Sequence, residues 1–213
     1  MDNASTVTIT TKQANASLFL QELKRDTAHQ HTQLEQQELL SALMSPTVSV
    51  QQYCAYLLLM QQVMFAYEDA ILPLVIPVLN KPSGQSAAAQ IQLDVENTGY
   101  DLGREVPGKY QMPQPQVSIS YALGFMYVIE GSKLGGKFIY KHINSTLGFT
   151  ETNGAGYLAN TGADTGKQWK AFLTSFSAYI VEHDAPNEAI EGSKEAFASI
   201  YKYFQNNAAH YAV

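Results

Sequence analysis

The stretch Leu123-Gly124-Phe125-Met126-Tyr127-Val128-Ile129-Glu130-Gly131-Ser132-Lys133-Leu134-Gly135-Gly136 decides the fold of this chain. Its apolar content predicts a helix, although four of its residues are glycine, and an interior glycine costs a helix about 1 kcal/mol relative to alanine. At about 100° per residue, Gly124, Gly131 and Gly135 fall on one stripe of that helix, and Ser132 and Gly136 widen the stripe on one side. Such a bare face suits close packing against a second helix, or a flat ligand that lies against the backbone.

The composition is that of a globular protein with one core. A chain of 213 residues, 46% hydrophobic and 15% charged, is long enough for one sizeable core and too short for two full domains. The net charge of −6 argues against a nucleic acid as the main partner. The single Cys54 excludes an internal disulfide framework and fits a reducing compartment.

No part of the sequence predicts an association with a membrane. The start of the chain lacks the basic and then apolar pattern of a signal peptide. Residues 71–79 form the longest strongly apolar run, but this run is too short to span a bilayer and is interrupted by Pro73 and Pro77. We therefore expect a soluble, cytoplasmic protein without a membrane partner.

The remaining patterns predict helices and no strands. Residues 1–14 are polar and are expected to form a flexible arm, and residues 15–213 a single helical domain. Helical periodicity, caps and breaks place helices at about 17–43, 49–70, 86–100, 117–147, 167–182 and 186–207. A long connection with five glycines, residues 148–166, is of a kind that is often functional in a compact domain. The expected fold class is an all-α, single-domain bundle of six to eight helices.

The first long helix carries two histidines on different sides. Leu23, Thr27 and His31 share one face at helical spacing, which predicts that His31 faces the core. His29, only two positions away, points to the opposite side and to solvent. A histidine on an apolar face is either a satisfied core residue or a ligand, and the spacing leaves both open.

Several common cofactor sites are excluded by the sequence. It lacks the Gly-x-Gly-x-x-Gly turn of a dinucleotide site, the Cys pairs of a zinc site and the Glu-x-x-His pairs of a helical di-iron site. Gly131, Gly136 and Lys137 approach a phosphate-binding loop, but Phe138 stands where that loop needs Ser or Thr. A histidine on one helix and a bare backbone on another remain, and this arrangement is suited to a metalloporphyrin.

Two segments resemble the helices that enclose the heme in heme oxygenases. Residues 23–35, Leu-Lys-Arg-Asp-Thr-Ala-His-Gln-His-Thr-Gln-Leu-Glu, are similar to the proximal helix of the family. Residues 123–136 resemble the distal helix of its bacterial members, with Tyr-Val-x-Glu-Gly-Ser-x-Leu-Gly-Gly nearly complete. Weaker similarities lie at residues 169–172, Trp-Lys-Ala-Phe, and 194–197, Lys-Glu-Ala-Phe. The resemblance implies an all-α fold that holds heme between a proximal helix and a kinked distal helix.

The same resemblance implies an oxidoreductase of heme degradation. Heme would be both cofactor and substrate, and would be cleaved to biliverdin, carbon monoxide and ferrous iron. The reaction would use O2 and electrons from an external donor, a ferredoxin or a flavoprotein reductase. Two other classes of protein fit the same residues: a heme-binding or storage protein without catalysis, and a non-heme member of the same helical fold.

By resemblance to the family, five residues are expected around the iron. His31 would be the axial ligand of the heme iron, as a neutral imidazole, and Glu35 would accept the hydrogen bond of its other ring nitrogen. Gly131 and Gly135 would let the distal backbone lie over the heme, where backbone groups and ordered water assist the oxygen chemistry. Ser132 stands where the mammalian enzymes carry an aspartate that anchors distal water. Glu35 is equally what a solvated helix face carries.

Charged and hydroxyl side chains are expected at the edge of the heme. Lys24 resembles a family position that meets a heme propionate, and Lys170 and Tyr127 are further candidates. Ordinary surface charge, or core packing for the tyrosine, is the alternative for each. A basic strip, either a solvated face or a docking site for an acidic electron donor, consists of Lys133, Lys137 and Lys141.

Overall fold

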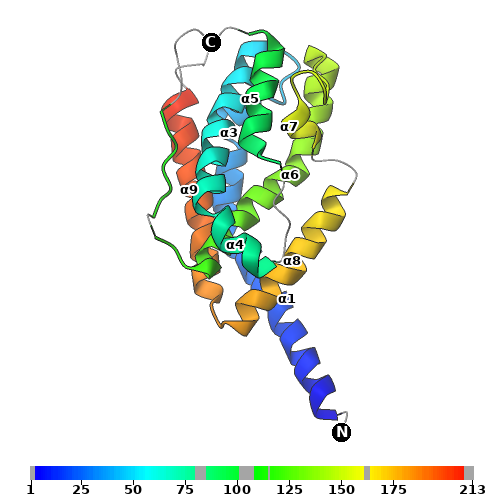
Figure 1. Cartoon of the computed structure of the whole chain (residues 1–213), viewed down its shortest axis with the longest axis vertical. Coiled ribbons are helices and arrows are strands. Elements are labelled where there is room, and N and C mark those ends of the chain that lie inside the picture. Colours follow the sequence, from blue (N-terminus) through cyan, green and yellow to red (C-terminus); the bar gives the residue numbers. More distant parts are fainter. Residues whose placement is uncertain (1–2, 80–84, 101–107, 115, 161–163, 209–213) are drawn as a thin grey trace.

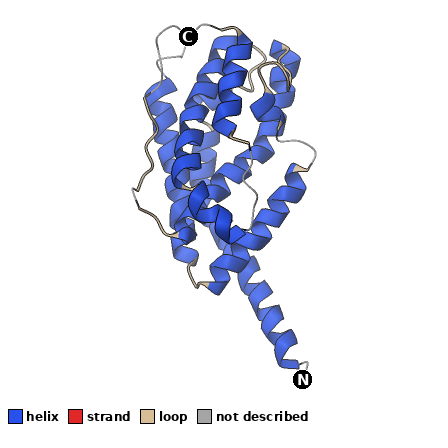
Figure 2. Cartoon of the chain, in the orientation of Figure 1, coloured by secondary structure: helices blue, strands red, loops and turns tan. Residues whose placement is uncertain are grey.

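Every regular element that the structure describes is a helix (Figure 2). The structure is a computed structural model, and it describes residues 3–79, 85–100, 108–114, 116–160 and 164–208. The helices are α1 (Asn3–Glu35), α2 (Glu38–Ala42), α3 (Val50–Ala70), α4 (Leu72–Leu79), α5 (Ala87–Thr98), α6 (Ile119–Leu147), α7 (Gly156–Ala159), α8 (Thr165–Glu182) and α9 (Pro186–Ala208). Figure 1 shows α3, α6 and α9 running through the bundle, with the N-terminal part of α1 projecting from it.

The first helix differs from its prediction at both ends. It begins at Asn3, so residues 3–14, predicted as a flexible arm, are helical. No glycine or proline occurs before Pro46, so nothing in this polar segment breaks a helix. The predicted helix over 17–43 is also divided, because the side chain of Gln37 accepts the N–H of Leu40 and caps a separate α2. The division of the chain into an arm and a domain at residue 15 stays a prediction.

The apolar α3 lies in the middle of the bundle, as its composition predicts. Ser49 caps it through a capping box with Gln52, in which each side chain bonds the other's backbone N–H. Helix α3 ends at Ala70, with Ile71 as its C-cap, and the axis of α4 is bent by 60° from that of α3. Within the described ranges no single helix is long and apolar enough to cross a membrane, whereas this bent pair passes by length and composition alone.

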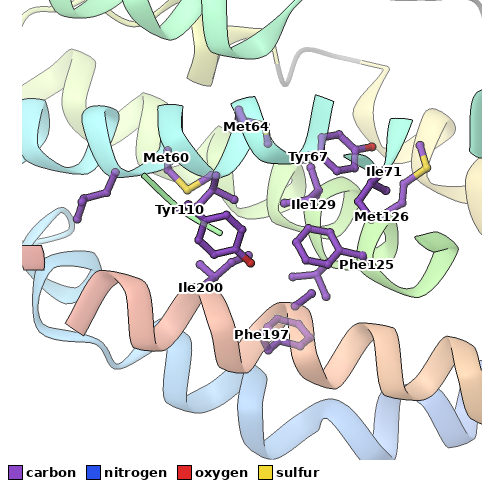
Figure 3. Packing of buried hydrophobic residues seen from close by; sticks show 14 of the residues in the cluster. Met60, Met64, Tyr67, Ile71, Tyr110, Phe125, Met126, Ile129, Phe197 and Ile200 are labelled. Carbon is purple, nitrogen blue, oxygen red and sulfur yellow. The ribbon is translucent and has the colours of Figure 1, made fainter. Parts of the chain in front are cut away.

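The core lies between α3, α6 and α9 (Figure 3). Buried side chains of α3 meet buried side chains of α6, and the rings of Tyr67 and Phe125 stack with centroids 6.4 Å apart. Phe197 and Ile200 of α9 close the cluster from the other side. Burial of each large apolar side chain stabilises the fold by about 1.5–3 kcal/mol, so this cluster contributes substantially to stability.

Helices α6 and α9 approach each other until their backbones touch. A Cβ built on Gly124 would stand 2.0 Å from the carbonyl oxygen of Ala189, and one built on Gly192 would stand 2.2 Å from the carbonyl oxygen of Tyr121. The buried Ser193 hydroxyl donates to the carbonyl of Gly124 at 2.8 Å. Only glycine at these two positions permits this approach, so the glycines lock α6 onto α9.

A buried carboxylate fixes the connection between α6 and α8. Asp94 of α5 is 1% exposed and accepts the backbone N–H groups of Gly156, at 2.8 Å, and Tyr157, at 2.6 Å. It also accepts the side-chain amide of Gln90 at 3.1 Å. Asp94 therefore caps the N-terminus of α7, and α7 in turn packs on α6.

Candidate functional site

The imidazole of His31 lies at the edge of the bundle. The sequence pattern predicts that it faces the core, but its side chain is 55% exposed, whereas Leu23 and Thr27 on the same helix are buried. Each step of four residues moves a side chain by about 40° around the helix axis, so His31 points about 80° away from the direction of Leu23. One side of the ring still meets α9, where the Phe197 ring lies 5.5 Å away at 84°.

Glu35 lies next to His31, one helical turn further along α1. Its Oε2 is 3.4 Å from Nδ1 of the imidazole. An imidazole with Nδ1 turned toward a carboxylate presents Nε2 on its opposite edge, and Nε2 is a common metal-binding atom of histidine. His29 is exposed as well, so exposure alone does not distinguish the two histidines. The contacts of His31 with Glu35 and Phe197 do distinguish it.

The C-terminal half of the glycine stripe is open. Gly135 is exposed, and no described atom outside its own helix lies within 4 Å of the point where a Cβ would stand. Gly131, one turn earlier, meets only the edge of Trp169, whose Cη2 is 3.4 Å from that point. The backbone of α6 is therefore accessible at Gly135 and is bordered by an indole edge at Gly131.

Ser132 lies beside the stripe, and its hydroxyl is turned back onto its own helix. It donates to the carbonyl of Ile129 at 2.8 Å. A serine hydroxyl that donates one hydrogen bond still has lone pairs with which it can accept another. The residue is exposed, so these lone pairs are open to solvent.

Tyr127 borders the open face from the N-terminal side. Its ring lies 5.3 Å from the Trp169 ring and 6.1 Å from the Phe176 ring, and both of these belong to α8. Burial raises the pKa of the Tyr127 hydroxyl above its ordinary value. The hydroxyl therefore stays protonated at neutral pH and can donate a hydrogen bond.

The helices that carry these residues share their neighbours. Both α1, with His31, and α6, with Gly131 and Gly135, pack on α8 and on α9. Lys24 and Lys170 are exposed, on α1 and α8 respectively. Two hollows that the structure describes lie elsewhere: one is lined by residues of α1, the end of α8 and the α8–α9 turn, and the other by residues 109–111 and the end of α9. The candidate site therefore consists of the bare face of α6 and of His31, which the sequence analysis also singles out.

Comparison with known proteins gives the family. The heme oxygenase family model matches residues 101–206. The heme oxygenase PigA of Pseudomonas aeruginosa is 33% identical over 98 residues, 46% of this chain and 49% of PigA, so the match spans about half the length of that curated relative. The crystal structure of the NO- and CO-bound heme oxygenase from Neisseria meningitidis is similar with a TM-score of 0.68 and 28% identity, over 90% of this chain and 92% of that one. The chain belongs to the heme oxygenase family.

The family and its all-α fold are therefore confirmed. The roles of single residues of this chain stay predictions, as does the kink of α6 near its glycines. The structure brings His31 and Glu35 together. Trp169 lies next to both Tyr127 and Gly131.

Two contacts of the site were not predicted from the sequence. Phe197 and Trp169 occur in the weaker similarities at residues 194–197 and 169–172, but no pattern in the sequence pairs Phe197 with His31 or Trp169 with Gly131. Each partner is far away along the chain, so the pairing depends on how α8 and α9 dock. An aromatic residue at helical spacing is as typical of a core as of a site.

Proposed function

We propose that this protein binds heme between α1 and α6 and cleaves it oxidatively to biliverdin, carbon monoxide and ferrous iron. The observation that carries the proposal is the accessible backbone of α6 at Gly135, next to Gly131, in a chain of the heme oxygenase family. A glycine in the middle of a long helix is costly unless something must approach the backbone. Heme would supply both the macrocycle that is cleaved and the iron that activates dioxygen.

His31 would hold the iron through Nε2. Binding through that atom requires the proton of a neutral imidazole to sit on Nδ1, and the Glu35 carboxylate at 3.4 Å favours this tautomer. Phe197 limits the rotation of the ring from the side of α9. The donor set of a single neutral histidine, with a carboxylate behind it, fits the iron of a heme.

The propionates of heme would be met by cationic and hydroxyl groups. Lys24 lies seven residues before His31, which is about two helical turns. Its ammonium group and that of Lys170 are exposed and can pair with a carboxylate as point charges. The protonated hydroxyl of Tyr127 is a donor for the same kind of group.

On the distal side, the chain would contribute close backbone and few side chains. Gly135 leaves room for a flat ligand and for ordered water beside it, and among the described residues Gly131 has only the edge of Trp169 as a neighbour. Ser132 can accept a hydrogen bond from such a water while it donates to Ile129. These groups hold protons and water near the ligand without a bulky side chain above it.

The electrons would come from an acidic donor protein, either a ferredoxin or a flavoprotein reductase, that docks on the exposed side of α6. Phe138 is 70% exposed and Leu134 is 37% exposed, one turn apart on that side. Lys137 and Lys141 flank them, whereas the charge of Lys133 is paired with Glu130 at 3.0 Å. This positive, partly apolar surface on a chain of net charge −6 suits an acidic partner.

A heme titration with three proteins tests the proposal. Hemin is added to the wild type, to His31→Ala and to His29→Ala, and ascorbate is then added in air while the Soret band and the biliverdin absorption are followed. We expect the wild type and His29→Ala to form a sharp Soret band that decays to biliverdin. His31→Ala should lose both the sharp band and the turnover, and added imidazole should restore the band.

Each other outcome contradicts one part of the proposal. A wild-type Soret band that persists with ascorbate and oxygen would show a heme-binding protein without cleavage. A wild type that forms no band would exclude the heme site. Normal spectra and turnover in His31→Ala would exclude His31 as the ligand.

A further inference from the structure

Trp169 stands against the backbone of Gly131. Its Cη2 and Cζ3 atoms lie 3.4 and 3.8 Å from the point that a Cβ on Gly131 would occupy. The indole edge therefore faces the glycine side of α6, close enough that a methyl group on Gly131 would be in van der Waals contact with it. The face is walled at Gly131 and open at Gly135, where none of the described residues of other elements comes within 4 Å.

The indole is held in place from two sides. Its ring lies 5.3 Å from that of Tyr127 on α6 and 5.6 Å from that of Phe172 on α8. Phe172 is itself fully buried and stacks on Phe176, with centroids 5.4 Å apart. Aromatic pairs of this kind have preferred geometries worth about 0.5–1.5 kcal/mol beyond their buried area. Ring contacts on α6 and on α8 therefore hold the indole beside Gly131.

A heme bound on this face can rotate within its own plane without moving its iron. The axial bond to a histidine does not depend on that rotation, so it selects no meso carbon. Only groups at the rim of the macrocycle distinguish one rotation from another: charged partners for the propionates, and walls for the other edges. The rim contact that the structure describes at the glycine face is Trp169.

We propose that Trp169 is a specificity-determining residue that sets the in-plane orientation of the macrocycle, and with it the meso carbon that is cleaved. The proposal rests on the proposed function. The edge of the macrocycle that lies against the indole can carry a methyl or vinyl group but no propionate, because the Cη2 and Cζ3 carbons of Trp169 offer an apolar edge there. The propionates are thereby directed away from this wall.

The test compares Trp169→Phe with Phe172→Leu. Trp169→Phe keeps an aromatic ring next to Tyr127 and shortens the edge that reaches Gly131. Phe172→Leu loosens the same cluster from behind and leaves the indole edge in place. Two measurements are made on each protein: the biliverdin isomers released after turnover, and the proton NMR spectrum of the heme complex, in which each in-plane orientation gives its own set of heme methyl signals.

We expect Trp169→Phe to bind heme with less than about a threefold change in affinity, since its ring packing is retained. The minor biliverdin isomers and the minor set of methyl signals should rise together by several-fold. Phe172→Leu should show the wild-type proportions in both measurements, even where its melting temperature is lower.

Two outcomes would overturn the proposal. Unchanged isomers and unchanged methyl signals in Trp169→Phe would exclude the indole as a rim contact. An equal change in Phe172→Leu would assign the effect to a loosened cluster instead. A wild type that binds no heme would overturn the proposed function itself, and the hemin titration reports that result before either variant is made.

Discussion

The two ends of the glycine stripe on α6 have opposite surroundings. Gly124 lies where α6 touches α9, and an added Cβ would stand 2.0 Å from the carbonyl oxygen of Ala189. At Gly135 the same added atom would meet no described neighbour within 4 Å. Both glycines belong to one helical stripe, which therefore has one closely packed end and one open end.

The comparison separates two explanations that the sequence leaves open. Close packing of helices accounts for Gly124, and it is reinforced by Gly192 and by the Ser193 hydroxyl on the partner helix. It does not account for Gly135, which no other helix approaches within the described residues. Gly131 lies between the two cases, with an indole edge in place of a backbone. Packing does not explain a glycine at an open position of a helix, and the proposed ligand would explain it.

Gly124→Ala should have the largest effect on stability. A methyl group cannot fit 2.0 Å from a backbone oxygen, so α6 and α9 must move apart along their whole contact. Overpacking of a core costs about 1–3 kcal/mol and occasionally more, and we expect at least the upper end of this range here. Urea unfolding of the heme-free protein measures the change, with Gly135→Ala as the matched control on the same stripe. A loss below about 0.5 kcal/mol would show that the contact yields easily and would remove the distinction between the two ends.

Gly135→Ala should stabilise the heme-free protein, whereas Gly124→Ala should destabilise it. The added methyl group meets open space, and alanine is favoured over glycine inside a helix by about 1 kcal/mol. We therefore expect the heme-free protein to gain about 0.5–1 kcal/mol in the same unfolding experiment. The affinity for hemin should fall by at least about tenfold, or about 1.4 kcal/mol, because the methyl group holds the ligand away from the backbone. A variant that is more stable and binds heme normally would contradict the ligand explanation for this glycine.

Most of the helices could be predicted from the sequence because their ends carry strong local signals. Ser49, Ser86 and Ser118 cap α3, α5 and α6, and Pro186 occupies the first turn of α9. The start of α1 was misjudged because its polar composition resembles an arm, although nothing in it breaks a helix. Its end was misjudged because the cap that divides it, Gln37, is not a typical N-cap residue.

The candidate site was predictable only as far as single helices determine it. Glycine spacing gives the bare face, and the step of four residues from His31 gives its contact with Glu35. The exposure of His31 and the contacts of Phe197 and Trp169 depend on how α1, α8 and α9 dock. The way in which helices dock is set by close contacts such as that of Gly124 with Ala189. The sequence around Gly124 does not identify Ala189 as the residue that it contacts.

Reversal of the charge on the open half of α6 should change turnover with a protein electron donor, and this is the smallest of the three expected effects. Lys137→Glu combined with Lys141→Glu reverses the charge beside Phe138, and Lys109→Glu combined with Lys202→Glu makes the same charge change next to the end of α9, away from α6. Exposed charges steer a partner by less than about 1 kcal/mol each, and salt screens them. Turnover with an acidic ferredoxin should therefore fall several-fold at low ionic strength in the first variant, and this difference should vanish as salt is added.

Turnover with ascorbate, which needs no docking, should be the same in both variants. An equal loss with ferredoxin in the control variant would assign the effect to net charge rather than to this surface. A loss confined to the α6 variant would place electron delivery on the open half of the helix. The locked half, at Gly124, would then maintain the fold, and the open half, at Gly135, would serve both the ligand and its electron donor.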